Sequence, residues 1–178
     1  VIGGRSILLL SSLGSSIDII LRENYRSVVA CQEMKESLER MDSGILFVLL
    51  GEGEPGRDLI RTNERVFADA LQAEINNITL PEEGEKARSI ESQYELFRRE
   101  VEGVIASERG AKEARNIYFG RILPLFQKIK GTADEILRMN QQNMNDRNDG
   151  ARSIAMRARR QMYALLLGAV LIGAAYML

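Results

Sequence analysis

The densest cluster of polar side chains able to bind a ligand lies near the start of the chain. Within a stretch of helical periodicity it comprises Arg22, Glu23, Asn24, Tyr25 and Arg26. Arginines on facing helices of a dimer can hold a small anion, such as a carboxylate, through paired hydrogen bonds. The alternative is that these charges are solvated and paired with Glu135 or Asp134, as most surface charges are.

Helix geometry adds residues from the second half of the chain to this cluster. If the first and last long helices run antiparallel with equal rise, residues 22–26 lie beside residues 135–139, and the loop at 77–84 hangs over the same place. The resulting ligand-binding candidates are Arg22, Asn24, Tyr25, Arg26, Glu135 and Asn140. A second, distal candidate consists of Arg40, Tyr118 and Arg121.

Other kinds of chemistry are poorly represented. The 178 residues contain no histidine, which excludes histidine-based metal sites, Ser/His/Asp triads and a phosphohistidine within this chain. The single cysteine, Cys31, excludes an internal disulfide and suits a small buried residue. The turn at 51–56 lacks the Lys-Ser/Thr of a phosphate-binding loop. We therefore expect no catalytic residue, no metal and no cofactor in this segment.

The charge balance also bears on partners. Lys and Arg number 24 and Asp and Glu 25, for a net charge of -1. Nucleic-acid binding favours a basic surplus, so no nucleic-acid partner is expected.

Long helices must position the candidate residues. A seam of alternating three- and four-residue spacings runs through the first helix for more than five heptads. Its members are Leu10, Leu13, Ile17, Ile20, Asn24, Ser27, Cys31, Met34, Leu38, Met41, Ile45 and Val48. Asn24 and Ser27 are polar, and such a layer can fix register or mark a functional level.

Three further helices are predicted, at about 57–77, 82–107 and from 111 onward. Thr79 is expected to cap the third helix, with Pro81 in its first turn. Pro124 is expected to bend the fourth. Inward-facing positions on these helices are Ile60, Phe67, Leu71, Glu74, Ile75, Ile78, Ile90, Tyr94, Phe97, Val101, Val104, Ile105, Tyr118, Ile122, Leu125, Ile129, Thr132, Ile136 and Met139.

These lengths predict an all-α fold. It is an antiparallel four-helix bundle in which the long first and fourth helices continue as a membrane-proximal stalk. Two helices alone leave much of the seam uncovered, so we expect a homodimer through the stalk. The stretch 145–150 is a poor helix former and is either a weak point or a hinge.

The chain ends in an apolar run. Residues 162–178 carry no charge, and a spanning helix needs about 17–25 such residues. The expected organisation is the end or outer flank of a first transmembrane helix at 1–9, an extracytoplasmic helical domain at 10–160, and the truncated start of a second transmembrane helix at 161–178.

Two runs resemble a known family. The run from Ile17 to Gly44, containing RENYRSVVACQEM, and the run from Tyr118 to Met144, containing GRILPLFQKIKGTADEILRMNQQ, are similar to the first and last periplasmic helices of bacterial membrane histidine kinases of the alginate-regulating type. The resemblance covers most of 17–162, although the middle helices carry little of it.

The resemblance implies the sensor domain of a two-component histidine kinase in the bacterial inner membrane, with residues of about 10–160 in the periplasm. Its partners would be an unknown small ligand or periplasmic protein, and a response regulator reached only through a kinase part outside this segment.

Two other functions stay open: a ligand-binding module of a chemoreceptor, and a tail-anchored cytosolic adaptor. Positive charge marks the cytoplasmic flank of a membrane helix. Arg157, Arg159 and Arg160 therefore favour the adaptor.

Overall fold

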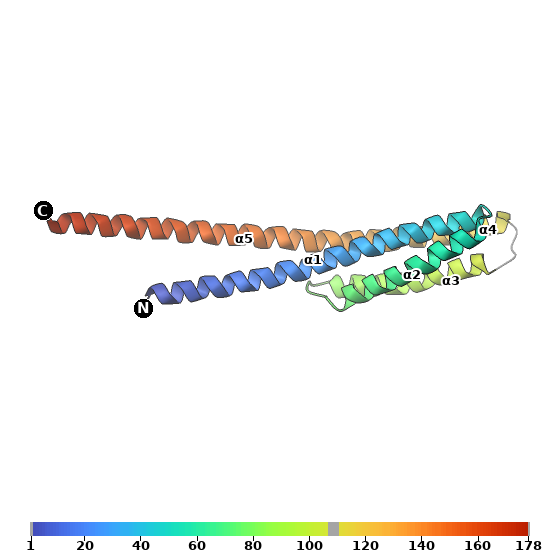
Figure 1. The fold of residues 1–178 in the computed structure, drawn as a ribbon, viewed down its shortest axis with the longest axis horizontal. Coiled ribbons are helices and arrows are strands. Elements are labelled where there is room, and N and C mark those ends of the chain that lie inside the picture. Colours follow the sequence, from blue (N-terminus) through green and yellow to red (C-terminus); the bar gives the residue numbers. More distant parts are fainter. Residues whose placement is uncertain (1, 107–110, 178) are drawn as a thin grey trace. The chain divides into compact units, whose positions relative to one another are not determined.

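The computed structural model describes residues 2–106 and 111–177, and within them every regular element is helical (Figure 1). Side chains are described from residue 21 onward, apart from 107–111, 165, 169, 170, 172, 173 and 176–178. The elements are α1 (Ile2–Leu49), α2 (Gly53–Ile75), α3 (Glu83–Ile105), α4 (Ala111–Ile117), the π-helical segment η1 (Tyr118–Ile122) and α5 (Leu123–Met177). The predicted all-α class is confirmed, as is the contrast between long first and last helices and short middle ones.

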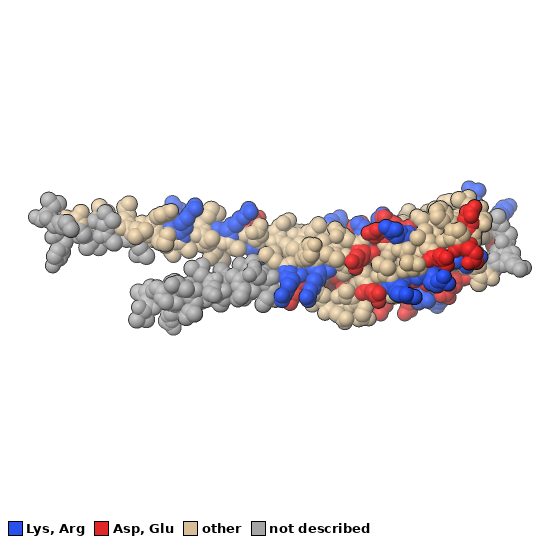
Figure 2. Space-filling model, viewed as in Figure 1, with Lys and Arg blue, Asp and Glu red and all other residues tan. Residues whose placement is uncertain are grey.

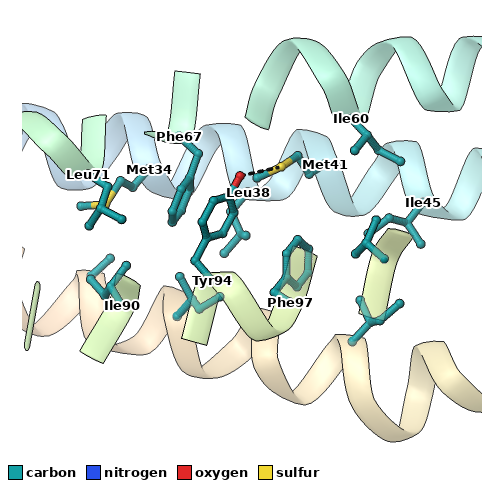
Figure 3. Packing of buried hydrophobic residues seen from close by; sticks show 14 of the residues in the cluster. Met34, Leu38, Met41, Ile45, Ile60, Phe67, Leu71, Ile90, Tyr94 and Phe97 are labelled. Carbon is teal, nitrogen blue, oxygen red and sulfur yellow. Dashed lines mark hydrogen bonds between the residues drawn. The ribbon is translucent and has the colours of Figure 1, made fainter. Parts of the chain in front are cut away.

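The chain divides into two units, Arg22–Gln142 and a second unit made of Val1–Leu21 with Asn143–Leu178. The larger unit holds one apolar core, to which α1, α2, α3 and the segment from α4 into α5 all contribute. In α1 the predicted seam supplies it, because Cys31, Met34, Leu38, Met41 and Ile45 are all fully buried. Figure 3 shows the Phe67 and Tyr94 rings stacked between these helices, with centroids 3.9 Å apart.

Contacts between helices show how α1 and α5 pair inside this unit. Lys35 forms an ion pair with Asp134, Glu39 with Lys130 at 2.5 Å, and Asp42 accepts a hydrogen bond from Tyr118 at 2.9 Å. The partner numbers fall along α5 as the numbers rise along α1, so the two helices are antiparallel.

The helices α1 and α2 approach closely at two glycines. A Cβ atom on Gly56 would lie 2.5 Å from the carbonyl oxygen of Gly44, and one on Gly44 would lie 2.8 Å from the carbonyl oxygen of Gly56. Only residues without a side chain allow backbones to come this near. The turn that precedes α2 uses Gly51 at φ 99°, a conformation that favours glycine.

The start of α3 differs from the sequence prediction. Thr79 does not cap this helix; the residue before its first turn is Glu82, in a left-handed conformation at φ 68°. The backbone amides of Thr79 and Leu80 instead donate to the side chain of Glu83. Ile78, predicted to face inward, is 42% exposed because the chain has already left α2.

Pro124 affects the geometry of the helical turn that precedes it. Proline lacks an amide hydrogen and its ring crowds the carbonyl four residues before it, here that of Gly120. The chain responds with the π-helical turn η1, in which the amide of Leu123 bonds to the carbonyl oxygen of Tyr118. One wider turn therefore precedes the proline.

In the smaller unit, α5 continues as a helix through the stretch 145–150, where a weak point was predicted. None of the described residues forms a helical stretch long and apolar enough to cross a membrane. The side chains of the N-terminal stub at 1–9, on which its predicted role depends, lie outside what the structure describes.

We predict that Gly56→Ala lowers the free energy of unfolding by about 1–3 kcal/mol, because the new methyl group overlaps the backbone of α1. The matched control is Gly131→Ala, since a Cβ there meets nothing within 4 Å. That variant should gain about 0.5–1 kcal/mol from helix propensity alone. Urea unfolding followed by circular dichroism measures both; equal effects of the two substitutions would contradict the close approach.

Candidate functional site

A layer of polar side chains closes the core of the larger unit at the end where the α2–α3 loop lies. Its fully or almost fully buried members are Asn24 and Ser27 of α1, Glu74 of α2, Glu83 of α3 and Asn140 of α5. Buried polar groups are costly unless they are paired, so such a layer calls for a specific arrangement.

Glu83 is the best-satisfied member of this layer. One carboxylate oxygen accepts from the backbone amides of Thr79 at 2.6 Å and Leu80 at 2.9 Å. The other accepts from the side-chain amide of Asn140 at 2.5 Å. Three N–H donors suit a carboxylate anion, so this one side chain joins the loop to α5.

The loop is also joined to α1. The side-chain amide of Asn77 donates to the Glu23 carbonyl at 2.8 Å and to the Ser27 hydroxyl at 3.0 Å. The Thr79 hydroxyl donates to the side-chain carbonyl of Asn24 at 3.1 Å. The sequence prediction that the 77–84 loop lies at the level of residues 22–26 is confirmed. The predicted pairing of the two long helices is wrong in register, because Lys35 pairs with Asp134 and Glu39 with Lys130, about two helical turns further along α5.

Glu74 is the least satisfied member of this layer, in which the buried Oδ1 atom of Asn140 also has no hydrogen-bond partner. The Glu74 side chain is 0% exposed, yet neither carboxylate oxygen has a hydrogen-bond partner of good geometry. Burial raises its pKa to about 7, the negative charge of Glu83 adds to the rise, and the neighbouring Ser27 hydroxyl opposes it. A carboxyl group in these surroundings gains and loses its proton near neutral pH.

Cys31 lies beside the two glutamates. Its thiol is 0% exposed, and burial raises its pKa far above the ordinary value, with further contributions from the charges of Glu74 and Glu83. A thiol in this state is unreactive. The interpretation of Cys31 as a small buried residue is confirmed.

A pocket of about 440 Å³ opens beside the polar layer, between α1 and α2. Its lining residues are Tyr25, Arg26, Val29, Ala30, Glu33, Ala73, Asn76 and Asn77. The amide of Asn77 therefore borders the pocket while it donates to Ser27 of the buried layer. Two of the predicted ligand-binding residues, Tyr25 and Arg26, meet at this pocket.

The remaining predicted residues of this cluster are divided between the layer and the surface. Asn24 and Asn140 are buried in the layer, whereas Arg22 is exposed and Tyr25 is 61% exposed. Glu135 lies on the outer side of α5 and bonds to Lys86 at 2.5 Å, which lowers its pKa.

The second predicted cluster does not come together through any contact in the described residues. The buried Tyr118 donates a hydrogen bond to Asp42. Burial mainly, and this hydrogen bond in addition, raise the pKa of the Tyr118 phenol to about 12. Arg40 pairs with Glu36 on its own helix, and Arg121 pairs with Glu100. Arg40 instead borders a larger groove of about 830 Å³ between α1 and α2, rimmed by the carboxylates of Glu33, Glu36, Asp58 and Asp69.

Sequence reasoning placed Glu74 on the inner side of its helix but missed it and Glu83 as members of a site. The usable signal was the polar pair Asn24 and Ser27 in an otherwise apolar seam, because a buried polar layer on one helix needs polar partners on the others.

Figure 2 shows that Lys and Arg are interspersed with Asp and Glu over the visible face of the larger unit. Among the described residues no group of three or more Cys, Asp or Glu side chains could hold a metal ion.

No protein-family model matches this chain, and no curated protein or solved structure matches it either.

We predict that the free energy of unfolding falls as pH rises through neutrality. The Glu74 pKa is raised from about 4.5 in the unfolded chain to about 7. Its stabilising contribution is therefore complete below pH 4.5 and lost as pH rises through 7. At about 1.4 kcal/mol per pKa unit, the loss is on the order of 3 kcal/mol.

Urea unfolding between pH 4.5 and 8 measures this slope, and Glu74→Gln serves as the uncharged variant of equal shape. The difference between the two proteins isolates Glu74 from other titrating groups. Parallel pH profiles would contradict the assignment.

Proposed function

We propose that this chain is the extracytoplasmic signal-sensing domain of a transmembrane two-component sensor histidine kinase. In this proposal, residues of about 10–160 lie outside the inner membrane and the uncharged run that follows enters it. A stimulus changes the larger unit, and α5 passes the change to a cytoplasmic kinase.

The observation that carries the proposal is the extent of α5. One helix of 55 residues, Leu123–Met177, includes both Asn140, which binds Glu83 of the polar layer, and the uncharged run from Met162. A change that repositions Asn140 acts on the same helix that leads toward the apolar end. Small shifts of one helix are a known way to transmit a signal.

The two resembling runs support the same proposal. They correspond to most of α1 and to the stretch from η1 into α5. These are the two helices that would enter the membrane in a sensor kinase. The polar layer draws Asn24 from the first run and Asn140 from the second.

The proposal includes a homodimer that forms through the stalk. Ile154 and Met156 on α5 are 37% and 59% exposed, and Met162 and Tyr163 are exposed as well. Apolar residues that a single chain leaves uncovered are suited to contact a second copy.

A tail-anchored cytosolic adaptor is the second candidate. Arg157, Arg159 and Arg160 directly precede the apolar run, and such charges mark the cytoplasmic side of a membrane helix. In the sensor proposal these arginines lie outside, so the side of the membrane on which the larger unit lies decides between the two candidates.

We predict that Ser92→Cys is labelled by a membrane-impermeant maleimide in intact bacterial spheroplasts. Ser92 is exposed on α3, and Cys31 is the single native thiol, so Ser92→Cys is made in a Cys31→Ser chain and Cys31→Ser alone is the unlabelled control. Labelling only after the membrane is permeabilised would support the adaptor and exclude the sensor topology.

We also predict that single cysteines placed along residues 141–152 form disulfide crosslinks between two copies in native membranes. The crosslinking yield should rise and fall with a period of about 3.5 residues, as it does along a two-helix seam. Uniform or absent crosslinking would argue against a dimer through this part of α5.

A further inference from the structure

We propose that Glu74 and Glu83 form a proton-binding site that holds the α2–α3 loop against α1 and α5, and that release of the proton frees the loop. The site lies wholly inside the larger unit and differs from the pocket at Arg26. We call the two glutamates and the loop that they hold the latch. The idea that the proton is the stimulus of the sensor rests on the function proposed above, whereas the latch itself does not.

The hydrogen bonds decide which glutamate carries the proton. Glu83 already accepts hydrogen bonds from the backbone amides of Thr79 and Leu80 and from the side-chain amide of Asn140, so both of its oxygens act as acceptors. Glu74 receives no donor in good geometry and is fully buried. A protonated Glu74 is neutral, and Glu83 and Ser27 are the side chains close enough to affect its pKa.

Among the described residues around Glu74, no cation lacks an acidic partner of its own. A proton is therefore what can neutralise the Glu74 carboxylate. On α1, Lys35 is paired with Asp134 of α5, and Cys31 is a buried thiol. On α3 the facing group is Glu83, a like charge. On α2 and in the loop that follows it, the neighbouring positions 70, 71, 77 and 78 carry no charge.

Loss of the proton would place two negative charges side by side in the core. Like charges at close range in a buried setting repel strongly, and each also loses its hydration. The direct relief is for Glu83 to move toward water. That movement breaks its bonds to Thr79, Leu80 and Asn140 together, which releases the loop from α5 and opens the layer around Cys31.

Cys31 provides a built-in test of this opening. The whole chain, held in detergent micelles, is treated with the uncharged disulfide 4,4′-dithiodipyridine, and release of thiopyridone gives the rate of thiol modification. At pH 5.5 the native chain and Glu74→Gln should react within twofold of each other. At pH 8 the native chain should react at least tenfold faster than the variant.

Comparing the native chain with Glu74→Gln at the same pH separates opening of the layer from ordinary ionisation of the Cys31 thiol. The charge of Glu74 raises the Cys31 pKa, so its removal would by itself speed the variant, opposite to the expected result. Glu91→Gln, an exposed change on α3, is the control for overall charge and should behave as the native chain. A native rate at pH 8 that does not exceed that of Glu74→Gln, or an equal effect of Glu91→Gln, would overturn the proposal.

Hydrogen exchange of the native chain gives a second measurement that needs no variant. The amides of Thr79 and Leu80, corrected for their intrinsic rates, should lose at least tenfold protection between pH 5.5 and 8. Unchanged protection overturns the latch whatever the variants do. Neither measurement depends on membrane topology, so failure of the latch is distinguishable from failure of the sensor function, which the labelling of Ser92→Cys tests.

Discussion

The carboxylate of Glu83 is the interaction on which the loop end of the larger unit depends. It collects two backbone amides from the loop and one side-chain amide from α5. To do so the chain places Glu82 in a left-handed conformation, which costs a residue with a side chain on the order of 1–3 kcal/mol. Charge-assisted hydrogen bonds offset that cost. The left-handed conformation of Glu82 and the burial of Glu83 therefore depend on each other.

The same end of the core combines two kinds of specificity. The apolar seam of α1 would tolerate a slide along α5, because one aliphatic layer resembles the next. Polar groups have fixed partners, and a displaced partner leaves a buried donor or acceptor unpaired at a cost of about 1–3 kcal/mol. The layer of Asn24, Ser27, Glu83 and Asn140 therefore sets the register of the helices. Within the layer, the two carboxylate oxygens of Glu74 and the Oδ1 atom of Asn140 have no hydrogen-bond partner.

Much of the fold could be predicted because burial on a helix repeats every three or four residues. The seam positions from Asn24 to Ile45 were correct for that reason, and the antiparallel pairing followed from helix lengths. The role of Glu83 could not be foreseen, since an acid in a first helical turn ordinarily faces solvent. Its burial follows from the backbone conformation of Glu82, which a local sequence pattern does not reveal. Likewise Arg22 and Tyr25 share a helix with Asn24 but point away from the layer.

The π-helical turn at Tyr118–Ile122 accommodates one residue more than an α-helical turn of the same span. Everything that follows is consequently rotated by one position, roughly 100° around the helix axis. Ile129, Ile136 and Asn140, which follow this turn, are buried in the larger unit. The residues before and after this turn therefore differ in their angular position around the helix axis. Reversion of the turn to α-helical geometry would rotate the residues that follow it about that axis.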